Sequence, residues 1–183
     1  MRLIIARHCQ TDWNALEKIQ GRTDIPLNDA GRQQARELAR SLKELDLSRV
    51  ITSPLLRAKE TAEIIAREHQ VDLLLDKRLE DLSFGRFEGH HFSILDPIAP
   101  RNVFPYDLRP HGGEHYEGIL ERQLNLLREM EHDSDEHVLI VGHGRSLNTL
   151  LHGLKREERV QQGSFIVIEG SYLKSFLSNE DSE

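Results

Sequence analysis

The sequence contains little cysteine, few aromatic residues and no long apolar run. Of its 183 residues one is Cys, one is Trp and 5% are aromatic. A single Cys excludes an internal disulfide, which fits a reducing compartment. No apolar run approaches the roughly 20 residues that a membrane helix needs, and the apolar start is too short for a signal peptide. We therefore expect a cytoplasmic protein with no membrane partner.

Length and composition are typical of one globular domain. Hydrophobic residues make up 38% of the chain and charged residues 30%. We predict a single domain over residues 1–178 and a frayed acidic tail over residues 179–183. The net charge of −7 argues against a nucleic-acid partner, and it makes any phosphate site depend on local cations. Nothing in the sequence indicates the oligomeric state.

Strand-like and helix-like segments alternate along the chain. Apolar runs predict strands at residues 3–6, 50–52, 73–75 and 138–141. Helical spacing predicts a helix after the N-cap candidate Asn28 and a second helix that opens at Ser53-Pro54, with Pro54 in its first turn. Two further helices are predicted by the apolar spacing over residues 116–130 and 147–154. Residues 82–113 are expected to be irregular, and residues 165–177 to form a hairpin that turns at Gly170-Ser171. The alternation predicts an α/β fold, a three-layer α/β/α sandwich around a mostly parallel, mixed sheet.

Cations and histidines occur at three of the predicted strand-to-helix junctions. Arg7 and His8 follow the first strand, and Arg57 follows the second. His143 follows the fourth strand and stands between two glycines. Because the carboxyl ends of parallel strands meet at one edge of a sheet, we expect these side chains to lie close together. Helix N-termini at that edge add N–H donors, so the sequence predicts an anion-binding site.

Two of these residues have simpler interpretations when taken alone. A cation such as Arg57 in the first turn of a helix opposes the helix dipole by about 0.3–1 kcal/mol, and an ion pair with Glu60 or Glu63 would offset that cost. A lone Gly-His-Gly run is compatible with a turn in which His143 is hydrogen-bonded locally.

Four ordered motifs favour the shared site. They are RHCQTDWN at residues 7–14, QGRTDIPLNDAGRQQA at 20–35, SPLLRAKETA at 53–62 and KRLEDLSFGRFEG at 77–89. Together they resemble the signature of the histidine phosphatase superfamily, the phosphoglycerate mutase-like proteins, and in particular its broad-specificity phosphatase branch. The resemblance covers residues 3–89 almost continuously, then residues 113–114 and 138–151.

The resemblance implies phosphoryl transfer through a covalent phosphohistidine at His8. Arg7, Arg57 and His143 would neutralise the phosphoryl oxygens as charge develops on them. The resemblance and the glycine pattern place further phosphate or substrate contacts at Asn14, Gln20 and Gly144. Such chemistry needs no cofactor, and we expect no metal, because the histidines of the irregular segment lack the spacing of a metal site.

The proton donor is less sharply defined by the motif. When the chain is aligned on Gly85 and Glu88, the catalytic Glu of the family falls on Asp81. Glu80 stands one position earlier and is the alternative acid. The donor would protonate the leaving oxygen and then activate water against the phosphohistidine.

We predict a phosphomonoester phosphatase of the histidine acid phosphatase type that acts on a small phosphorylated metabolite. A phosphoglycerate mutase is the first alternative, but the stretch between Asp81 and His143 is short, and an open site admits water. A non-catalytic module that binds phosphorylated ligands is the second. Specificity is expected in a rim over residues 82–118, whose candidate residues are Phe84, Phe87, Phe92, Phe104, Tyr106, Arg86, Arg101 and Arg109.

Cys9 stands where the family usually has Gly. One interpretation places its thiol beside the cationic site, where the pKa would fall and peroxide would inactivate the enzyme. The other treats Cys9 as a tolerated small residue.

Overall fold

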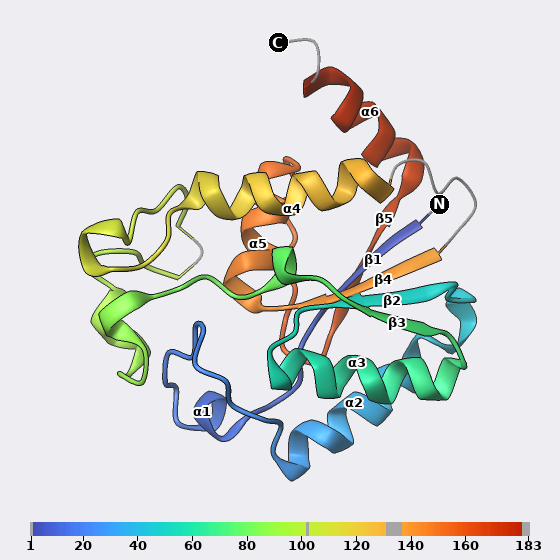
Figure 1. Cartoon of the computed structure of the whole chain (residues 1–183), viewed down its shortest axis with the longest axis horizontal. Coiled ribbons are helices and arrows are strands. Elements are labelled where there is room, and N and C mark those ends of the chain that lie inside the picture. Colours follow the sequence, from blue (N-terminus) through green and yellow to red (C-terminus); the bar gives the residue numbers. More distant parts are fainter. Residues whose placement is uncertain (1, 102, 131–136, 181–183) are drawn as a thin grey trace.

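The computed structural model describes residues 2–101, 103–130 and 137–180 (Figure 1). The strands are β1 (Arg2–Arg7), β2 (Arg49–Thr52), β3 (Asp72–Leu75), β4 (His137–Gly142) and β5 (Phe165–Glu169). The α-helices are α1 (Asp12–Ala15), α2 (Asp29–Ser41), α3 (Leu56–His69), α4 (Tyr116–Met130), α5 (Gly144–Gly153) and α6 (Gly170–Glu180). Short 3-10 helices are η1 (Lys43–Leu45), η2 (Lys77–Leu79), η3 (Gly85–Phe87), η4 (Phe92–Leu95) and η5 (Arg109–His111).

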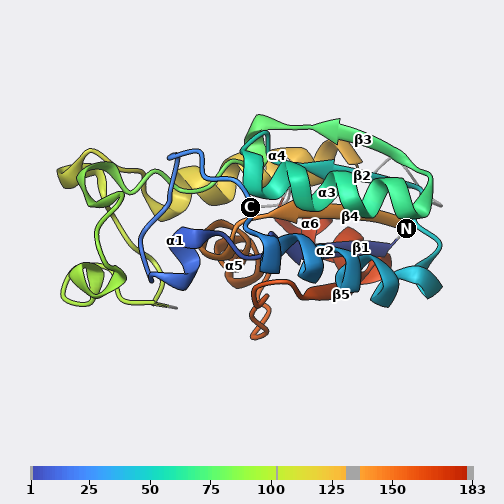
Figure 2. The same ribbon diagram turned by 90° about the horizontal axis from the view of Figure 1, so that it is seen from below.

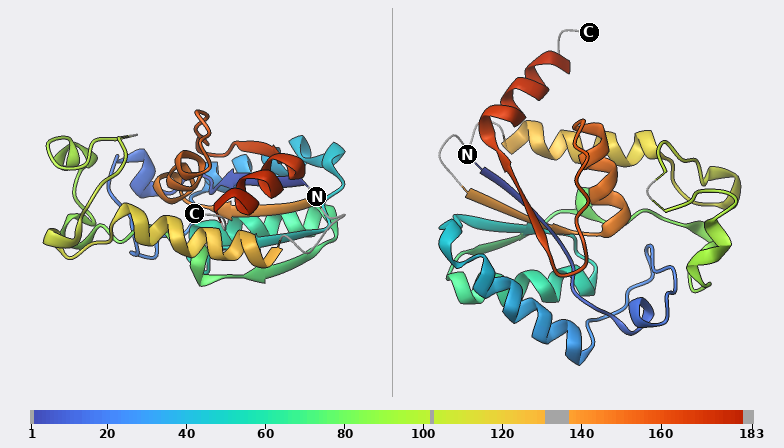
Figure 3. Two further views of the ribbon diagram at one scale, coloured as in Figure 1. Left: turned by 90° about the horizontal axis from the view of Figure 1, so that it is seen from above. Right: turned by 180° about the vertical axis from the view of Figure 1, so that it is seen from behind.

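One sheet runs through the molecule in the strand order β3-β2-β4-β1-β5. Neighbouring strands are parallel except for β5, which runs antiparallel to β1. Helices α2 and α3 cover one face of the sheet, and α4, α5 and α6 cover the other (Figure 2, Figure 3). The predicted three-layer sandwich around a mostly parallel, mixed sheet is confirmed.

The first strand shows why both faces of the sheet are covered. Leu3 and Ile5 pack toward α4, α5 and α6, whereas Ile4 and Ala6 pack toward α2 and α3. All four side chains are fully buried. A strand that is apolar on both faces lies in the interior of a sheet, so the polar residues that follow it emerge at the carboxyl edge.

A lobe formed by residues 82–116 lies beyond the carboxyl ends of the strands (Figure 1). It contains η3, η4 and η5, and no strand or α-helix occurs among its described residues before Tyr116. The lobe has an apolar cluster of its own, which includes Leu82, Phe87, Leu95 and Tyr106. The predicted irregular segment is thus a packed unit beside the sheet edge.

The predicted hairpin over residues 165–177 is wrong in its second half. Residues 165–169 form β5, but the chain continues from Gly170 as helix α6. Leu173 and Leu177, four residues apart, are buried against the core, which is helical and not strand spacing. The helix ends at Glu180, so it includes the first residues of the predicted frayed tail, and residues 181–183 lie outside the described part.

Helix α3 begins later than the Ser53-Pro54 pair predicts. Its first residue is Leu56, whose N–H donates to Asp24 Oδ1 at 2.7 Å. Because the helix begins at Leu56, Pro54 lies before it and not in its first turn. A carboxylate distant in sequence satisfies the first free N–H of the helix. None of the described helices is long and apolar enough to cross a membrane.

Candidate active site

The carboxyl edge of the sheet brings the three predicted junctions together. Arg7 ends β1 beside Gly142, which ends β4, and the N–H of His8 donates to the Gly142 carbonyl at 2.9 Å. The His8 and His143 ring centroids lie 5.3 Å apart. Arg57 lies in the first turn of α3, the helix that follows β2 in the chain, and β2 is the neighbour of β4 in the sheet. Parallel strands and their following helices therefore place all four side chains at one edge.

His8 is held as a neutral imidazole with one defined tautomer. Its side chain is buried, and Nδ1 lies 2.7 Å from the carbonyl oxygen of Cys9. A carbonyl only accepts, so Nδ1 carries the proton and Nε2 keeps its lone pair. Burial lowers the pKa of His8 well below its usual value, and the charges of Arg57 and Arg7 lower it further. These are the conditions that a histidine nucleophile needs.

Arg57 is a fully buried cation with three acceptors. Its Nη2 donates to the Gly21 carbonyl at 2.6 Å and to Asp81 Oδ2 at 3.2 Å, and its Nη1 donates to the Thr23 carbonyl at 3.0 Å. The local interpretation, an ion pair with Glu60 or Glu63, is therefore wrong. A buried charge is tolerated because these acceptors replace the water that it loses.

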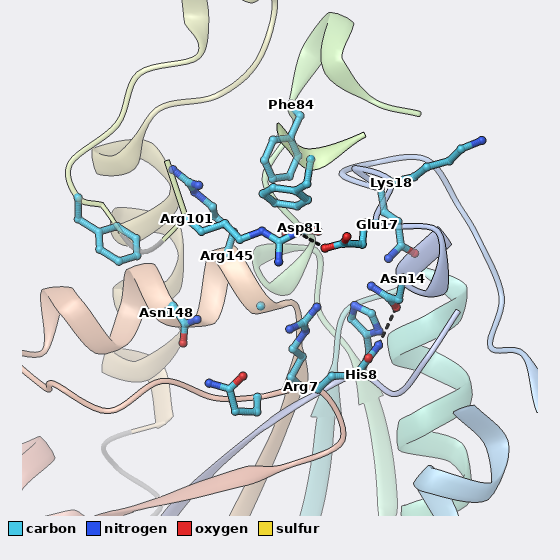
Figure 4. A pocket seen from close by; sticks show the side chains of 16 residues that line it. Arg7, His8, Asn14, Glu17, Lys18, Asp81, Phe84, Arg101, Arg145 and Asn148 are labelled. Carbon is cyan, nitrogen blue, oxygen red and sulfur yellow. Dashed lines mark hydrogen bonds and ion pairs between the residues drawn. The ribbon is translucent and has the colours of Figure 1, made fainter. Parts of the chain in front are cut away.

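Arg7 lies against the backbone of Gly144. A Cβ at Gly144 would stand 2.9 Å from Cζ and Nε of Arg7, so only glycine allows this approach. The Arg7 side chain points into a cavity of about 350 Å³ that it lines with His8 and Asp81 (Figure 4). Desolvation is the main influence on the pKa of Arg7 and lowers it. The guanidinium remains a cation aimed at the cavity.

His143 is fully buried at the N-cap of α5. Its Nε2 lies 2.8 Å from Ser53 Oγ, and its Nδ1 lies 3.9 Å from Asp81 Oδ2. Burial lowers the pKa of His143 well below its usual value, and the Arg57 charge adds to the effect. His143 is therefore neutral here, and any contribution to charge neutralisation comes from an N–H donor.

Asp81, and not Glu80, lies in the cavity. The Asp81 side chain is 10% exposed, and Oδ1 accepts from the Leu82 N–H at 2.9 Å and from Ser146 Oγ at 3.0 Å. Burial raises the pKa of Asp81, although Arg57 opposes the shift. The Glu80 carboxylate instead pairs with Arg22 away from the cavity. The geometry thus favours Asp81 as the proton donor.

Asn14 and Gln20 both line the cavity, as the motif implies. Asn14 Oδ1 accepts from the Thr11 N–H at 3.1 Å and from Gln162 Nε2 at 2.8 Å. Gln20 Oε1 accepts from Thr11 Oγ1 at 2.9 Å. Because both amide oxygens are engaged, the NH₂ groups remain as donors for an anion.

The rim prediction is right for some residues and wrong for others. Phe84, Phe92, Arg101 and Phe104 line the cavity. Phe87 and Tyr106 are buried in the core of the lobe, while Arg86 contacts His111 and Arg109 pairs with Asp107 outside the cavity. An irregular segment has no periodic alternation of buried and exposed positions, so the two groups of residues could not be separated from the sequence.

Other lining residues were missed by the sequence analysis. They are Glu17, Lys18, Arg145, Asn148, Gln161 and Gln162. Arg145 had a readable signal, because it is a cation in the first turn of a helix, as Arg57 is. Residues 161 and 162 had none, since they reach the cavity only through the pairing of β5 with β1.

The low-pKa interpretation of Cys9 is wrong. Its side chain is fully buried between the sheet and helices α2 and α3, and its N–H donates to Thr61 Oγ1 at 3.1 Å. Burial raises the pKa of Cys9 to about 11, so the thiol stays protonated at neutral pH. The side chain packs into the apolar core and not toward the cations. Cys9 thus fits the interpretation as a tolerated small residue.

The described residues contain no group of three or more His, Cys, Asp or Glu side chains arranged to hold a metal ion. The site consists of a neutral histidine, a buried carboxyl of raised pKa, and arginines that converge on one cavity. Such a set can bind a phosphoryl group and stabilise the charge that develops on its oxygens.

Comparisons with known proteins point to one family. The model of the histidine phosphatase superfamily (branch 1) matches residues 3–171. Phosphoglycerate mutase-like protein 4 of Arabidopsis thaliana is 35% identical over 158 residues, which cover 81% of this chain and 68% of that protein. A Bacillus subtilis protein named uncharacterized phosphatase PhoE is 34% identical over 148 residues, which cover 80% of this chain and 74% of that protein.

Solved structures agree with these sequence relatives. YhfR of Bacillus stearothermophilus superimposes with a TM-score of 0.80 at 31% identity, over 92% of this chain and 90% of that one. A mycobacterial glucosyl-3-phosphoglycerate phosphatase in complex with VO3 gives a TM-score of 0.79 at 25% identity, over the same shares of the two chains. By family model, relatives and fold, the chain belongs to the histidine phosphatase superfamily.

Proposed function

We propose that this protein is a phosphomonoester phosphatase that acts on a small phosphorylated metabolite through a phosphohistidine at His8. The observation that carries the proposal is the state of His8: it is neutral, with Nδ1 held by the Cys9 carbonyl. Beside it lies Asp81, a carboxyl of raised pKa. A nucleophile that is free of its proton and an acid that keeps its proton form a complementary pair.

The first step forms the phosphohistidine. His8 Nε2 attacks phosphorus, the ester P–O bond breaks, and Asp81 gives its proton to the leaving oxygen. Arg7 lines the cavity and neutralises the oxygens of the transferring group, while Arg57 and His143, buried behind the cavity wall, contribute a positive charge and an N–H donor. Because these groups are already in place, little reorganisation is needed as charge develops.

The second step releases phosphate. Asp81, now ionised, takes a proton from water, the water oxygen attacks phosphorus, and the N–P bond breaks. Inorganic phosphate and neutral His8 result, and Asp81 is again protonated. Water reaches the cavity past Glu17 and Arg101 at its rim, whose side chains are 61% and 54% exposed.

Trapping of the intermediate tests the proposal. Protein incubated with a phosphomonoester labelled in the phosphoryl group and quenched in alkali should carry label that is stable to base and labile to acid. His8→Ala should carry none and should lose turnover by about 10⁴-fold or more, because the nucleophile is gone. Equal labelling of the variant would contradict the role of His8. Absence of turnover by the unaltered protein on every phosphomonoester tested would favour a non-catalytic binding module.

A phosphoglycerate mutase is the competing activity, since relatives bear that name. Mutases must return the phosphoryl group to a second substrate before water arrives, whereas the rim here is exposed. Incubation with 3-phosphoglycerate and a catalytic amount of bisphosphoglycerate separates the two. We expect free phosphate; isomerisation without free phosphate would identify a mutase.

A further inference from the structure

The segment that carries Asp81 is held by side chains and not by regular secondary structure. Helix η2 ends at Leu79, and residues 80–84 belong to no helix or strand. Arg122, which α4 supplies, donates to the carbonyls of Arg78, of Glu80 at 2.7 Å and of Asp81 at 3.4 Å. The Arg122 side chain is only 18% exposed. One partly buried guanidinium thus donates to three main-chain carbonyls on the segment that leads to Asp81.

A second arginine approaches the same point from another part of the chain. Arg22 Nε donates to the Asp81 carbonyl at 3.0 Å, and its Nη1 pairs with the Glu80 carboxylate. Its Nη2 lies 3.2 and 3.1 Å from the two carboxylate oxygens of Glu114. The Asp81 carbonyl therefore accepts from two arginines that are 100 positions apart in the sequence.

Glu114 joins these contacts into one network. Its Oε2 accepts from the Ser83 N–H at 2.7 Å, two residues after Asp81. Its Oε1 lies 3.9 Å from Arg122 Nε, and the carboxylate also holds Arg22. Arg22, Glu114 and Arg122 together form what we call the acid clamp, which fixes the main chain before and after Asp81.

The acid clamp also connects Asp81 to the cation of the site. Arg22 lies between Gly21 and Thr23, whose carbonyls accept from the buried Arg57. This short loop therefore supports the two groups through different atoms: its main chain holds Arg57, and the Arg22 side chain holds Asp81. Loss of the Arg22 side chain removes only the second of these supports.

We propose that Arg22, Glu114 and Arg122 are positioning residues that set the reach of the Asp81 carboxyl to the leaving oxygen. The inference rests on the proposed function, in which Asp81 donates a proton there. None of the three lines the cavity, and each one donates to or accepts from the main chain within two residues of Asp81. Misplacement of a catalytic group by about 1 Å can reduce the rate by 10²-fold.

Leaving-group dependence distinguishes a positioning role from a merely structural one. p-Nitrophenyl phosphate has a leaving group that departs with little protonation, whereas phenyl phosphate needs the acid. The parameter kcat/KM reports the step in which the ester bond breaks. We expect Arg22→Gln to reduce kcat/KM for phenyl phosphate by about tenfold and for p-nitrophenyl phosphate by much less. Arg122→Lys, which keeps the charge but not the guanidinium fork, should show the same selective loss.

Arg78→Gln is the matched control. Arg78 lies in the same segment, but its side chain pairs with Asp76 and Glu129 at the surface. Its loss should leave the ratio of the two kcat/KM values as in the unaltered protein. Equal losses on both substrates in Arg22→Gln, or a ratio like that of Arg78→Gln, would overturn the positioning role. If Asp81→Asn itself shows no leaving-group dependence, the acid assignment fails and the positioning role fails with it, whereas failure of the phosphohistidine appears separately in the His8→Ala labelling.

Discussion

The sheet edge and the lobe make different contributions to the same cavity. At the edge, Arg7, His8 and His143 follow strands of a regular sheet, and their positions are tied to its register. In the lobe, Phe92 and Arg101 reach the cavity from 3-10 helices and turns around a small apolar cluster. The edge is built on regular hydrogen-bonded strands, whereas the lobe is irregular. If the proposed function holds, the difference predicts that chemistry depends on the sheet and selectivity on the lobe.

Among the variants that test this comparison, removal of the Asp81 carboxyl should have the largest effect. Asp81→Asn is expected to lower kcat/KM for phenyl phosphate by about 10²-fold or more, because the leaving oxygen loses its proton donor. Glu80→Gln should lose much less, since Glu80 only pairs with Arg22. A larger loss in Glu80→Gln would show that the motif alignment is shifted by one residue.

The pH profile of the same variant sharpens the test. Turnover needs protonated Asp81 and neutral His8. The pKa of Asp81 is raised above 3.8 and that of His8 is lowered well below 6.5. Activity should therefore be high at acidic pH and fall as rising pH ionises Asp81. Asp81→Asn should lack this alkaline fall, because nothing is left to ionise at that position, and retention of the fall would assign it to another group.

A glycine in each region offers a paired test of intermediate size. Gly144→Ala places a Cβ 2.9 Å from the Arg7 guanidinium and should reduce kcat/KM by about tenfold or more without loss of folding stability. Gly112 in the lobe has φ +77° and open space around it. Gly112→Ala should cost about 1 kcal/mol of unfolding free energy with unchanged kcat/KM. Kinetic assays give kcat/KM, and urea denaturation gives the unfolding free energy of each variant. A loss of kcat/KM in Gly112→Ala but not in Gly144→Ala would refute the assignment of the chemistry to the sheet edge.

The smallest effect is expected from a change in the lobe wall. Arg101 lies 4.0 Å over the ring of Phe92, a contact of about 0.5–1 kcal/mol at an exposed site. Phe92→Ala should change the KM for individual phosphomonoesters by a few-fold and alter their ranking, while kcat stays close to that of the unaltered protein. KM and kcat for a panel of phosphorylated metabolites provide the measurement. A large fall in kcat for every substrate would mean that the lobe takes part in the chemistry.

Most of the fold and the reactive core of the site could be predicted from the sequence. Apolar runs gave the strands, and the residues that follow parallel strands had to meet at one edge. The meeting of Arg7, His8, Arg57 and His143 at that edge was predicted in this way. Helix α6 was missed because residues 172–177 were assigned a strand spacing, although Leu173 and Leu177 repeat with helical spacing.

Only the tertiary structure decided the ionisation and the support of these groups. Burial lowers the pKa of His8 and raises the pKa values of Asp81 and Cys9, and the packing places Cys9 in the apolar core. The acid clamp joins Arg22 and Arg122 across 100 positions of sequence. Local patterns determine which residues end a strand or begin a helix, because those preferences act over a few residues. Desolvation and hydrogen bonds between distant segments arise only when the chain is packed, so no local pattern records them.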